Sequence, residues 1–207
     1  MKFTNHHTNI LLNLLRWRRD VRHFRPDPID PDLLSRLEDA IALGPSVGNS
    51  QPWRIVHVKS QEVRRQVLES HQAANVDAAT GYDRAKREKY VSLKLAGLRD
   101  APVHLAVFTD LSPKAGDGLG RQTMPETLTY STVIAIHTLW LVARSMNLGV
   151  GWVSILEPDK VHRCLDVDPE WHLTAYLCVG YPTFDDNTPE LERKDWQSRA
   201  KQPWLIR

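Results

Sequence analysis

Cysteine is scarce in this sequence of 207 residues, and a large excess of charge of either sign is missing. The two cysteines, Cys164 and Cys178, lie in apolar surroundings without CxxC or Cys/His spacing, which favours a reduced cytosolic protein and indicates no metal site. The 27 basic and 25 acidic side chains leave a formal net charge of +2. This balance provides no broad positive field for nucleic acid, so any site for an anion must be local.

The sequence also lacks long apolar runs and nucleotide-binding fingerprints. No stretch approaches the length needed to cross a bilayer, and residues 1–10 lack the basic and apolar regions of a signal peptide. We therefore expect a cytoplasmic protein with no membrane partner. A GxxxxGK(S/T) loop is absent, and Gly149-Val150-Gly151 is too short to be a dinucleotide-binding motif.

Helical and strand patterns alternate irregularly from end to end, without a repeat or a long linker. With 42% hydrophobic and 25% charged residues, this pattern predicts a single soluble α+β domain over residues 1–207. Asp30, as an N-cap, and Pro31 begin a helix that Gly44 and Pro45 end. Strands are expected at residues 53–58, 103–108, 149–154 and 173–179.

Two further segments have a distinctive character. Residues 125–147 are apolar over too wide an arc for a surface helix, which predicts a central buried helix. His137 on that helix is more typical of a core histidine than of a ligand. Residues 182–207 are polar, rich in proline and tryptophan, and without a clear period, so we expect this C-terminal extension to wrap a partner subunit or to cover a ligand.

The segment Arg18-Arg19-Asp20-Val21-Arg22 is the first candidate for chemistry. Three guanidiniums within five residues can clamp a phosphate, because each presents a planar fork of donors and keeps its charge near neutral pH. A solvated basic turn is the alternative, since arginine is usually exposed. Asp20 either neutralises its neighbours or serves as a carboxylate tuned for proton transfer.

The loop Pro45-Ser46-Val47-Gly48-Asn49-Ser50-Gln51-Pro52-Trp53 is the second candidate. It delivers a run of amide and hydroxyl groups into a strand, and such groups can read the donor and acceptor edge of a heterocycle. On spacing alone an ordinary turn is the better explanation, because Gly, Pro, Ser and Asn are the usual turn residues.

The third candidate is Gly149-Val150-Gly151-Trp152-Val153-Ser154. Two glycines allow the backbone to lie flat against a planar group, although Gly149 as a helix C-cap is a competing explanation.

Together, RRDVRHF, GPSVGNSQPWRIV, GVGWVSIL and AYLCVGYP resemble the nitroreductase superfamily in content and order over nearly the whole chain. Within it, RRDVR, YVSLKLAGLRDAP, GRQTMPET, Tyr130-Ser131-Thr132 and GWVSI look most like the 5,6-dimethylbenzimidazole synthase family. The resemblance implies an FMN-binding α+β fold with a mainly antiparallel sheet flanked by helices. It also implies a homodimer with FMN at the interface and terminal extensions that embrace the partner.

Carried over by position, the resemblance assigns Arg18, Arg19 and Arg22 to the phosphate and ribityl chain of FMN. A late basic residue usually completes the phosphate site, and Arg193, Lys194 and Arg199 all compete for it, with Arg193 as the working choice. A lid over the flavin is expected at about residues 73–98, including Tyr82, Tyr90 and Lys94. The implied flavin-binding set is Arg18, Arg19, Asp20, Val21, Arg22, Ser46, Asn49, Gln51, Gly151, Trp152, Val153, Ser154 and Arg193.

The activity implied is the oxygen-dependent fragmentation of reduced FMN to 5,6-dimethylbenzimidazole, the lower ligand of cobalamin, and erythrose 4-phosphate. Asp20 and Ser154 are the implied catalytic residues, and Asp20 is the sharper signal because ordinary nitroreductases commonly have Ser or Thr there. O₂ is the co-substrate, no metal is implied, and a separate NAD(P)H-dependent flavin reductase is expected to supply reduced FMN. A conventional NAD(P)H-dependent nitroreductase or flavin reductase is the first alternative, and a non-catalytic flavin-binding protein is the second.

Overall fold

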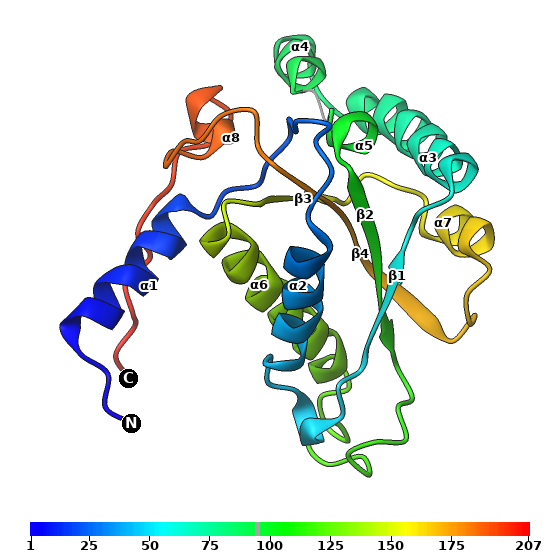
Figure 1. Cartoon of the computed structure of the whole chain (residues 1–207). Coiled ribbons are helices and arrows are strands. Elements are labelled where there is room, and N and C mark those ends of the chain that lie inside the picture. The colour runs from blue at the N-terminus through cyan, green and yellow to red at the C-terminus, as the bar shows by residue number, and fades with distance from the viewer. Residues whose placement is uncertain (94–95) are drawn as a thin grey trace.

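The computed structural model describes residues 1–93 and 96–207, and a four-stranded antiparallel sheet lies at its centre. The strands run in the order β1-β2-β4-β3, so that β2 and β4 are central (Figure 1). Each predicted strand is present, and β2 and β4 are longer than the apolar runs that predicted them. The bounds are β1 Trp53–His57, β2 Val103–Asp110, β3 Gly149–Val153 and β4 Trp171–Gly180.

Helices cover both faces of this sheet. One face packs against α2 (Pro31–Ala42) and α6 (Thr127–Ser145), and the opposite face packs against α3 (Gln61–Thr80) and α7 (Pro158–Leu165) (Figure 1). Each face of the sheet has its own hydrophobic core, because successive side chains of β2 point to opposite faces. Val107 faces the α6 side, while Ala106 and Phe108 face the α3 side. The predicted α+β architecture with a mainly antiparallel sheet is therefore confirmed.

The helix that begins at Pro31 has the predicted start. The side chain of Asp30 accepts a hydrogen bond from the backbone N–H of Asp32, and Pro31 occupies the first helical position. The remaining helical segments are short or peripheral. They are α1 Asn5–Trp17, the 3₁₀ turn η1 Val47–Asn49, α4 Arg84–Ser92, α5 Gly97–Asp100 and α8 Glu190–Arg193. None of the described helices is long and apolar enough to cross a membrane.

Helix α6 departs from the prediction of a fully buried central helix. Ile136 and Leu139 are buried against the sheet, but Tyr130 and Ile134 are 52% and 43% exposed. His137 is also exposed, so the expectation of a core histidine is wrong. The wide apolar arc thus comprises one face that packs on the sheet and a second apolar face that this chain leaves uncovered.

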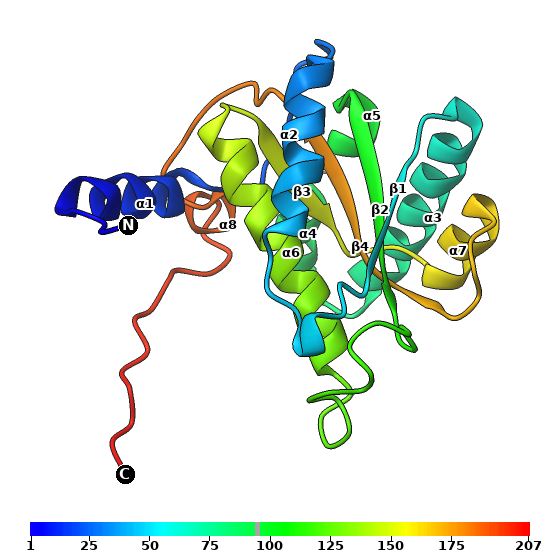
Figure 2. The ribbon, with the colours of Figure 1, turned by 60° about the horizontal axis from the view of Figure 1, so that its bottom comes forward.

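The two ends of the chain project from this body. Helix α1 has no buried residue, and its side chains Ile10, Leu11 and Leu15 are exposed. The C-terminal segment after α8 has no helix or strand, and it leads away from the sheet and its helices (Figure 2). Trp204 and Ile206 in this segment are 96% and 91% exposed.

The glycines of β3 are required by the segment that carries the arginines. Asp20 pairs with Val150 as an isolated parallel bridge, which brings the next residue, Val21, against β3. A Cβ atom at Gly151 would lie 2.2 Å from the carbonyl oxygen of Val21, and one at Gly149 would lie 2.7 Å from its side chain. Helix α6 ends at Ser145, so Gly149 is not its C-cap.

We expect Gly151→Ala to lower the free energy of unfolding by about 3 kcal/mol, because the colliding atom is backbone and cannot rotate away. For a chain of this size that corresponds to a fall in Tm of roughly 6–12 °C by calorimetry. Gly81→Ala is the matched control, since its Cβ would meet only the carbonyl oxygen of Ala78 at 3.8 Å. Equal melting temperatures for the two variants would contradict the close approach of Val21 to β3.

Candidate active site

The Arg18–Arg22 segment lines a groove between the end of α1, the second half of α6 and the segment around α8. The indole Nε1 of Trp140 on α6 donates to the carbonyl oxygen of Arg19 (3.2 Å), and the guanidinium of Arg18 lies 4.7 Å from the centre of a Trp140 ring. The Arg19 guanidinium donates to the carbonyl oxygen of Asn187 at 2.9 Å. These contacts fix the segment between α6 and the C-terminal extension.

The arginines of this groove differ in whether a carboxylate neutralises them. Arg22 Nε lies 3.4 Å from Asp20 Oδ2 and 3.9 Å from Glu190 Oε2. Arg193 Nε lies 3.1 Å from Asp186 Oδ2, and its guanidinium also covers the ring of Phe184.

In contrast, Arg18 and Arg19 have no carboxylate within 4 Å among the described residues. Desolvation and the nearby charge of Arg199 lower the pKa of both guanidiniums. Among the described residues of the groove, Arg18 and Arg19 are therefore the two arginines without an ion-pair partner, although the charges of Asp20 on Arg18 and of Asp186 on Arg19 act in the opposite direction from beyond 4 Å.

Asp20 lies at the inner end of the groove, directly against β3. Its Oδ1 accepts a hydrogen bond from the backbone N–H of Trp152 at 2.9 Å, and its side chain is 39% exposed. Desolvation raises the pKa of Asp20 above its ordinary value, and it outweighs the opposing effects of the Trp152 N–H and of Arg22. The carboxyl group is thus held rigidly by one oxygen while it remains accessible from the groove.

Ser154 follows the last residue of β3, two positions after the backbone group that holds Asp20. Its side chain is exposed, whereas Gly151 and Val153 are buried and Trp152 is half-buried. The predicted residues Asp20, Gly151, Trp152, Val153 and Ser154 are therefore neighbours along one edge strand.

The Ser46–Gln51 loop lies elsewhere. Its Val47 N–H donates to the hydroxyl of Ser131, near the beginning of α6. Ser46 Oγ accepts from the Gln51 N–H at 3.1 Å, and the Gln51 side-chain amide donates to Asn49 Oδ1 at 2.9 Å. Asn49 and Gln51 both have positive φ angles, 52° and 42°, a conformation that costs a non-glycine residue energy and is typical of functional loops.

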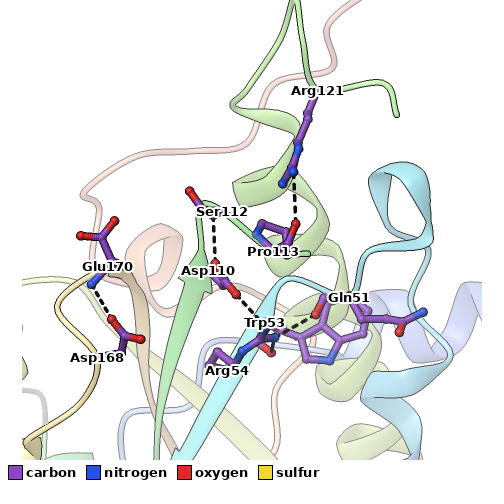
Figure 3. A network of polar contacts seen from close by, with 9 residues as sticks. All are labelled: Gln51, Trp53, Arg54, Asp110, Ser112, Pro113, Arg121, Asp168 and Glu170. Carbon is purple, nitrogen blue, oxygen red and sulfur yellow. Dashed lines mark hydrogen bonds and ion pairs between the residues drawn. The ribbon is translucent and has the colours of Figure 1, made fainter. Parts of the chain in front are cut away.

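The loop of residues 113–121 supports the Ser46–Gln51 loop from outside. A Cβ at Gly116 would lie 2.6 Å from the carbonyl oxygen of Gly48, so the two loops touch through their backbones. The Arg121 guanidinium closes this outer loop on the Pro113 carbonyl oxygen (Figure 3). In the same view Arg54 bonds Asp110 at 2.7 Å, which fixes the strand that leaves the Ser46–Gln51 loop.

The Arg18–Arg22 segment and the Ser46–Gln51 loop, which we call the two half-sites, thus contact the same helix at separate positions. Ser131 and Trp140 mark their positions on α6, and nine residues of α-helix separate them by about 13 Å. One chain does not bring Ser46, Asn49 and Gln51 together with the arginines. The exposed apolar face of α6 includes Tyr130, Val133 and Ile134, and the last two lie between these positions along the helix.

The segment expected to form a lid contacts the C-terminal extension. The rings of Tyr82, Tyr90 and Trp196 form a cluster with centre-to-centre distances of 5.1–6.3 Å, and Lys89 Nζ donates to the Asp195 carbonyl oxygen. Lys94 lies outside the described residues. The sequence alone did not identify Trp196, because its aromatic partners are more than 100 residues earlier in the chain.

Comparison with known proteins agrees with this architecture. Residues 15–181 match the nitroreductase family. The structure of oxidized iodotyrosine deiodinase bound to FMN and 3-iodo-L-tyrosine superposes with a TM-score of 0.74 at 20% identity, covering 95% of this chain and 97% of the other. The structure of an FMN complex from Exiguobacterium sibiricum superposes with a TM-score of 0.66 at 15% identity, covering 93% of each chain. The chain therefore belongs to the nitroreductase family.

The sequence relatives narrow this assignment. The 5,6-dimethylbenzimidazole synthase of Rhodobacter capsulatus is 50% identical over 99% of each chain. That of Rhodospirillum rubrum is 52% identical over 94% of this chain and 92% of its own. An NADH dehydrogenase of Thermus thermophilus is 25% identical over 80% of this chain and 83% of its own. Within the nitroreductase family, the chain belongs to the 5,6-dimethylbenzimidazole synthases.

Proposed function

We propose that this protein forms 5,6-dimethylbenzimidazole by fragmenting reduced FMN with O₂, and that the sugar carbons leave as erythrose 4-phosphate. The observation that carries the proposal is the position of Asp20, a carboxylate held on β3 directly after Arg18 and Arg19, which have no carboxylate within 4 Å among the described residues. Family membership at about 50% identity supports the same conclusion. Bound reduced FMN would supply both the electrons and the carbon skeleton of the product.

The charges of the groove fit the phosphate of FMN. Of the arginines that line the groove, Arg18 and Arg19 have no carboxylate within 4 Å among the described residues, and a dianion would relieve their mutual repulsion with Arg199. Arg22 and Arg193 are already paired with acidic side chains. We therefore assign the phosphate to Arg18, Arg19 and Arg199, with Arg199 in place of Arg193.

Asp20 and Ser154 are proposed to perform different tasks. The second oxygen of Asp20, Oδ2, has only the 3.4 Å contact with Arg22 Nε and would take up and return a proton, for which a pKa above the ordinary value of a carboxyl group is suited. Ser154 carries a neutral hydroxyl, which would hold the reacting group by a hydrogen bond without adding a charge.

A homodimer would complete the site. If the exposed faces of two α6 helices pack antiparallel about a two-fold axis, the loop of one chain comes alongside the arginines of the other. Ser46, Asn49 and Gln51 would then contact the flavin that the partner binds by its phosphate. The exposed residues of α1 and of the C-terminal extension, including Trp204, would cover the partner, and residues 73–98 would close over the flavin.

The direct test is to mix the pure protein with chemically reduced FMN in air and to detect 5,6-dimethylbenzimidazole by mass spectrometry. A separate NAD(P)H-dependent flavin reductase in the cytoplasm would provide the reduced flavin in the cell. A conventional nitroreductase, the alternative function, would instead reduce a nitroaromatic or quinone with NAD(P)H. Recovery of intact FMN together with such turnover would refute the proposed function.

Arg18→Ala is expected to weaken FMN binding by about tenfold to a hundredfold, which corresponds to the loss of one or two charge-assisted hydrogen bonds. Arg193→Ala is the matched control, because its guanidinium is already paired with Asp186 and we expect a change of less than about threefold. Riboflavin, which lacks the phosphate, should bind both variants and the wild type equally in fluorescence titrations. If Arg18→Ala weakens riboflavin as much as FMN, the phosphate assignment is wrong.

A further inference from the structure

Ser154 lies in a short connection that is fixed at both ends by packed elements. Residues 154–157 join β3, which ends at Val153, to α7, which begins at Pro158. Val153 is buried in the sheet, and Val161 of α7 is buried against α3. The direction of the Ser154 hydroxyl is therefore set by the backbone conformation of this connection.

Two consecutive buried polar residues of α3 hold that connection. Nδ1 of His71 lies 2.9 Å from the carbonyl oxygen of Ile155, and the hydroxyl of Ser70 accepts a hydrogen bond from the N–H of Glu157 at 3.0 Å. Ser70 is 0% exposed and His71 is 8% exposed. Because a carbonyl oxygen can only accept, the proton of this bond resides on Nδ1 of His71.

His71 is also the last buried residue of α3. Its buried residues, Val67, Ser70 and His71, all lie in its first eleven positions, and none of the residues from Gln72 to Thr80 is buried. The exposed second half, up to Thr80, forms the beginning of the segment 73–98. His71 thus lies at the base of the proposed lid and simultaneously bonds the residue that follows Ser154.

We infer that His71 is a positioning residue that fixes Ser154 and connects it to α3, the helix whose second half begins the proposed lid. The importance of Ser154 in this inference rests on the proposed function. The contact between His71 and Ile155 is independent of that function. With the bond in place, the backbone at Ile155 follows α3 whenever the lid segment moves, so Ser154 keeps its orientation relative to that helix. Without a donor at this position, the buried carbonyl oxygen of Ile155 loses its partner and the connection relaxes.

The test compares three variants of the full-length protein. His71→Leu removes the donor at similar volume, and His71→Asn places an amide N–H close to the position of Nδ1. Val67→Ala is the control, because Val67 lies one turn earlier on the same buried face and its side chain cannot form a hydrogen bond to residues 154–157, so this substitution destabilises the protein and leaves the His71 contact in place. Hydrogen exchange of the unliganded protein reports the contact, and product formed per reduced FMN consumed reports its consequence.

We expect the amide of Glu157, which Ser70 holds in the same connection, to exchange about tenfold faster in His71→Leu and at nearly the wild-type rate in His71→Asn, because loss of the neighbouring bond to Ile155 loosens the connection. Product per reduced FMN should fall about fivefold or more in His71→Leu, with FMN affinity changed less than about threefold, and should recover in His71→Asn. Val67→Ala should lower Tm without changing the product ratio.

Unchanged exchange in His71→Leu would overturn the inference, as would an unchanged product ratio or an equal fall in Val67→Ala. The proposed function and the inference about His71 can be refuted independently of each other. If the wild type forms no 5,6-dimethylbenzimidazole, the proposed function is wrong, while the exchange measurements still decide whether His71 holds this connection.

Discussion

Replacement of Asp20 by asparagine is expected to slow the formation of 5,6-dimethylbenzimidazole by about two orders of magnitude or more, the scale of general acid–base catalysis. The amide oxygen of asparagine can still accept the hydrogen bond from the Trp152 N–H, so β3 and the Arg18–Arg22 segment should keep their arrangement. What is lost is the group that takes up a proton. Reduced FMN should then be reoxidised by oxygen without being cut.

The measurement is product formed per reduced FMN consumed, with FMN binding checked separately by fluorescence quenching. In the wild type the rate should fall on the acid side of the pH profile, with a midpoint above the ordinary value of about 3.9 for aspartate, because desolvation raises the pKa of Asp20. Asp20→Asn should lack this acid limb. A near-normal yield and rate in Asp20→Asn would remove this residue from the mechanism.

Ser154→Ala provides the comparison for this experiment. A lost positioning hydrogen bond should reduce the rate less than a lost base, by roughly tenfold. The Asp20 variant also separates catalysis from charge balance. If Asp20 only neutralised Arg22, its removal would leave the groove more positive, and FMN would bind at least as tightly while product still formed.

Local patterns in the sequence were sufficient to predict the four strands and the helices α2 and α6, whereas α3 and α7, which cover the other face of the sheet, were not predicted. The cap formed by Asp30 and Pro31 placed the start of α2, and the β-branched runs placed all four strands, because these signals act between residues close in the chain. The proximity of Asp20 to Trp152 followed only from resemblance. It depends on a bridge between Asp20 and Val150, residues that are far apart in sequence.

Features of the site that depend on long-range pairing were not predictable in this way. The pairing of Arg22 with Glu190 joins residues that are far apart in the chain, and no sequence pattern indicates that Arg193 pairs with Asp186 seven residues earlier. The sequence therefore offered no reason to distinguish these arginines from Arg18. The same limit applies to α6. Its wide apolar arc was correctly recognised, but a pattern within one chain does not distinguish a face that meets the sheet from one that this chain leaves exposed.

The separation of the two half-sites leads to the last prediction, which concerns mixed dimers. One chain carries Asp20→Asn, and the other carries a loop variant with Ser46→Ala, Asn49→Ala and Gln51→Ala. Each variant alone should be nearly inactive, since every site of the first lacks the base and every site of the second lacks the loop contacts. If each site takes its groove from one chain and its loop from the other, a mixed dimer contains one site with both defects and one fully intact site.

Coexpression with two affinity tags isolates the mixed dimers, which should have roughly half the activity of the wild type, because one of the two symmetry-related sites is restored. This recovery from near zero follows from the position of the loop about 13 Å along α6 from the arginines. A mixed dimer of two copies of Asp20→Asn with different tags controls for any effect of tagging and should stay inactive. If the mixed dimers remain as inactive as their parents, each site is built within a single chain, and the antiparallel pairing of α6 must be abandoned.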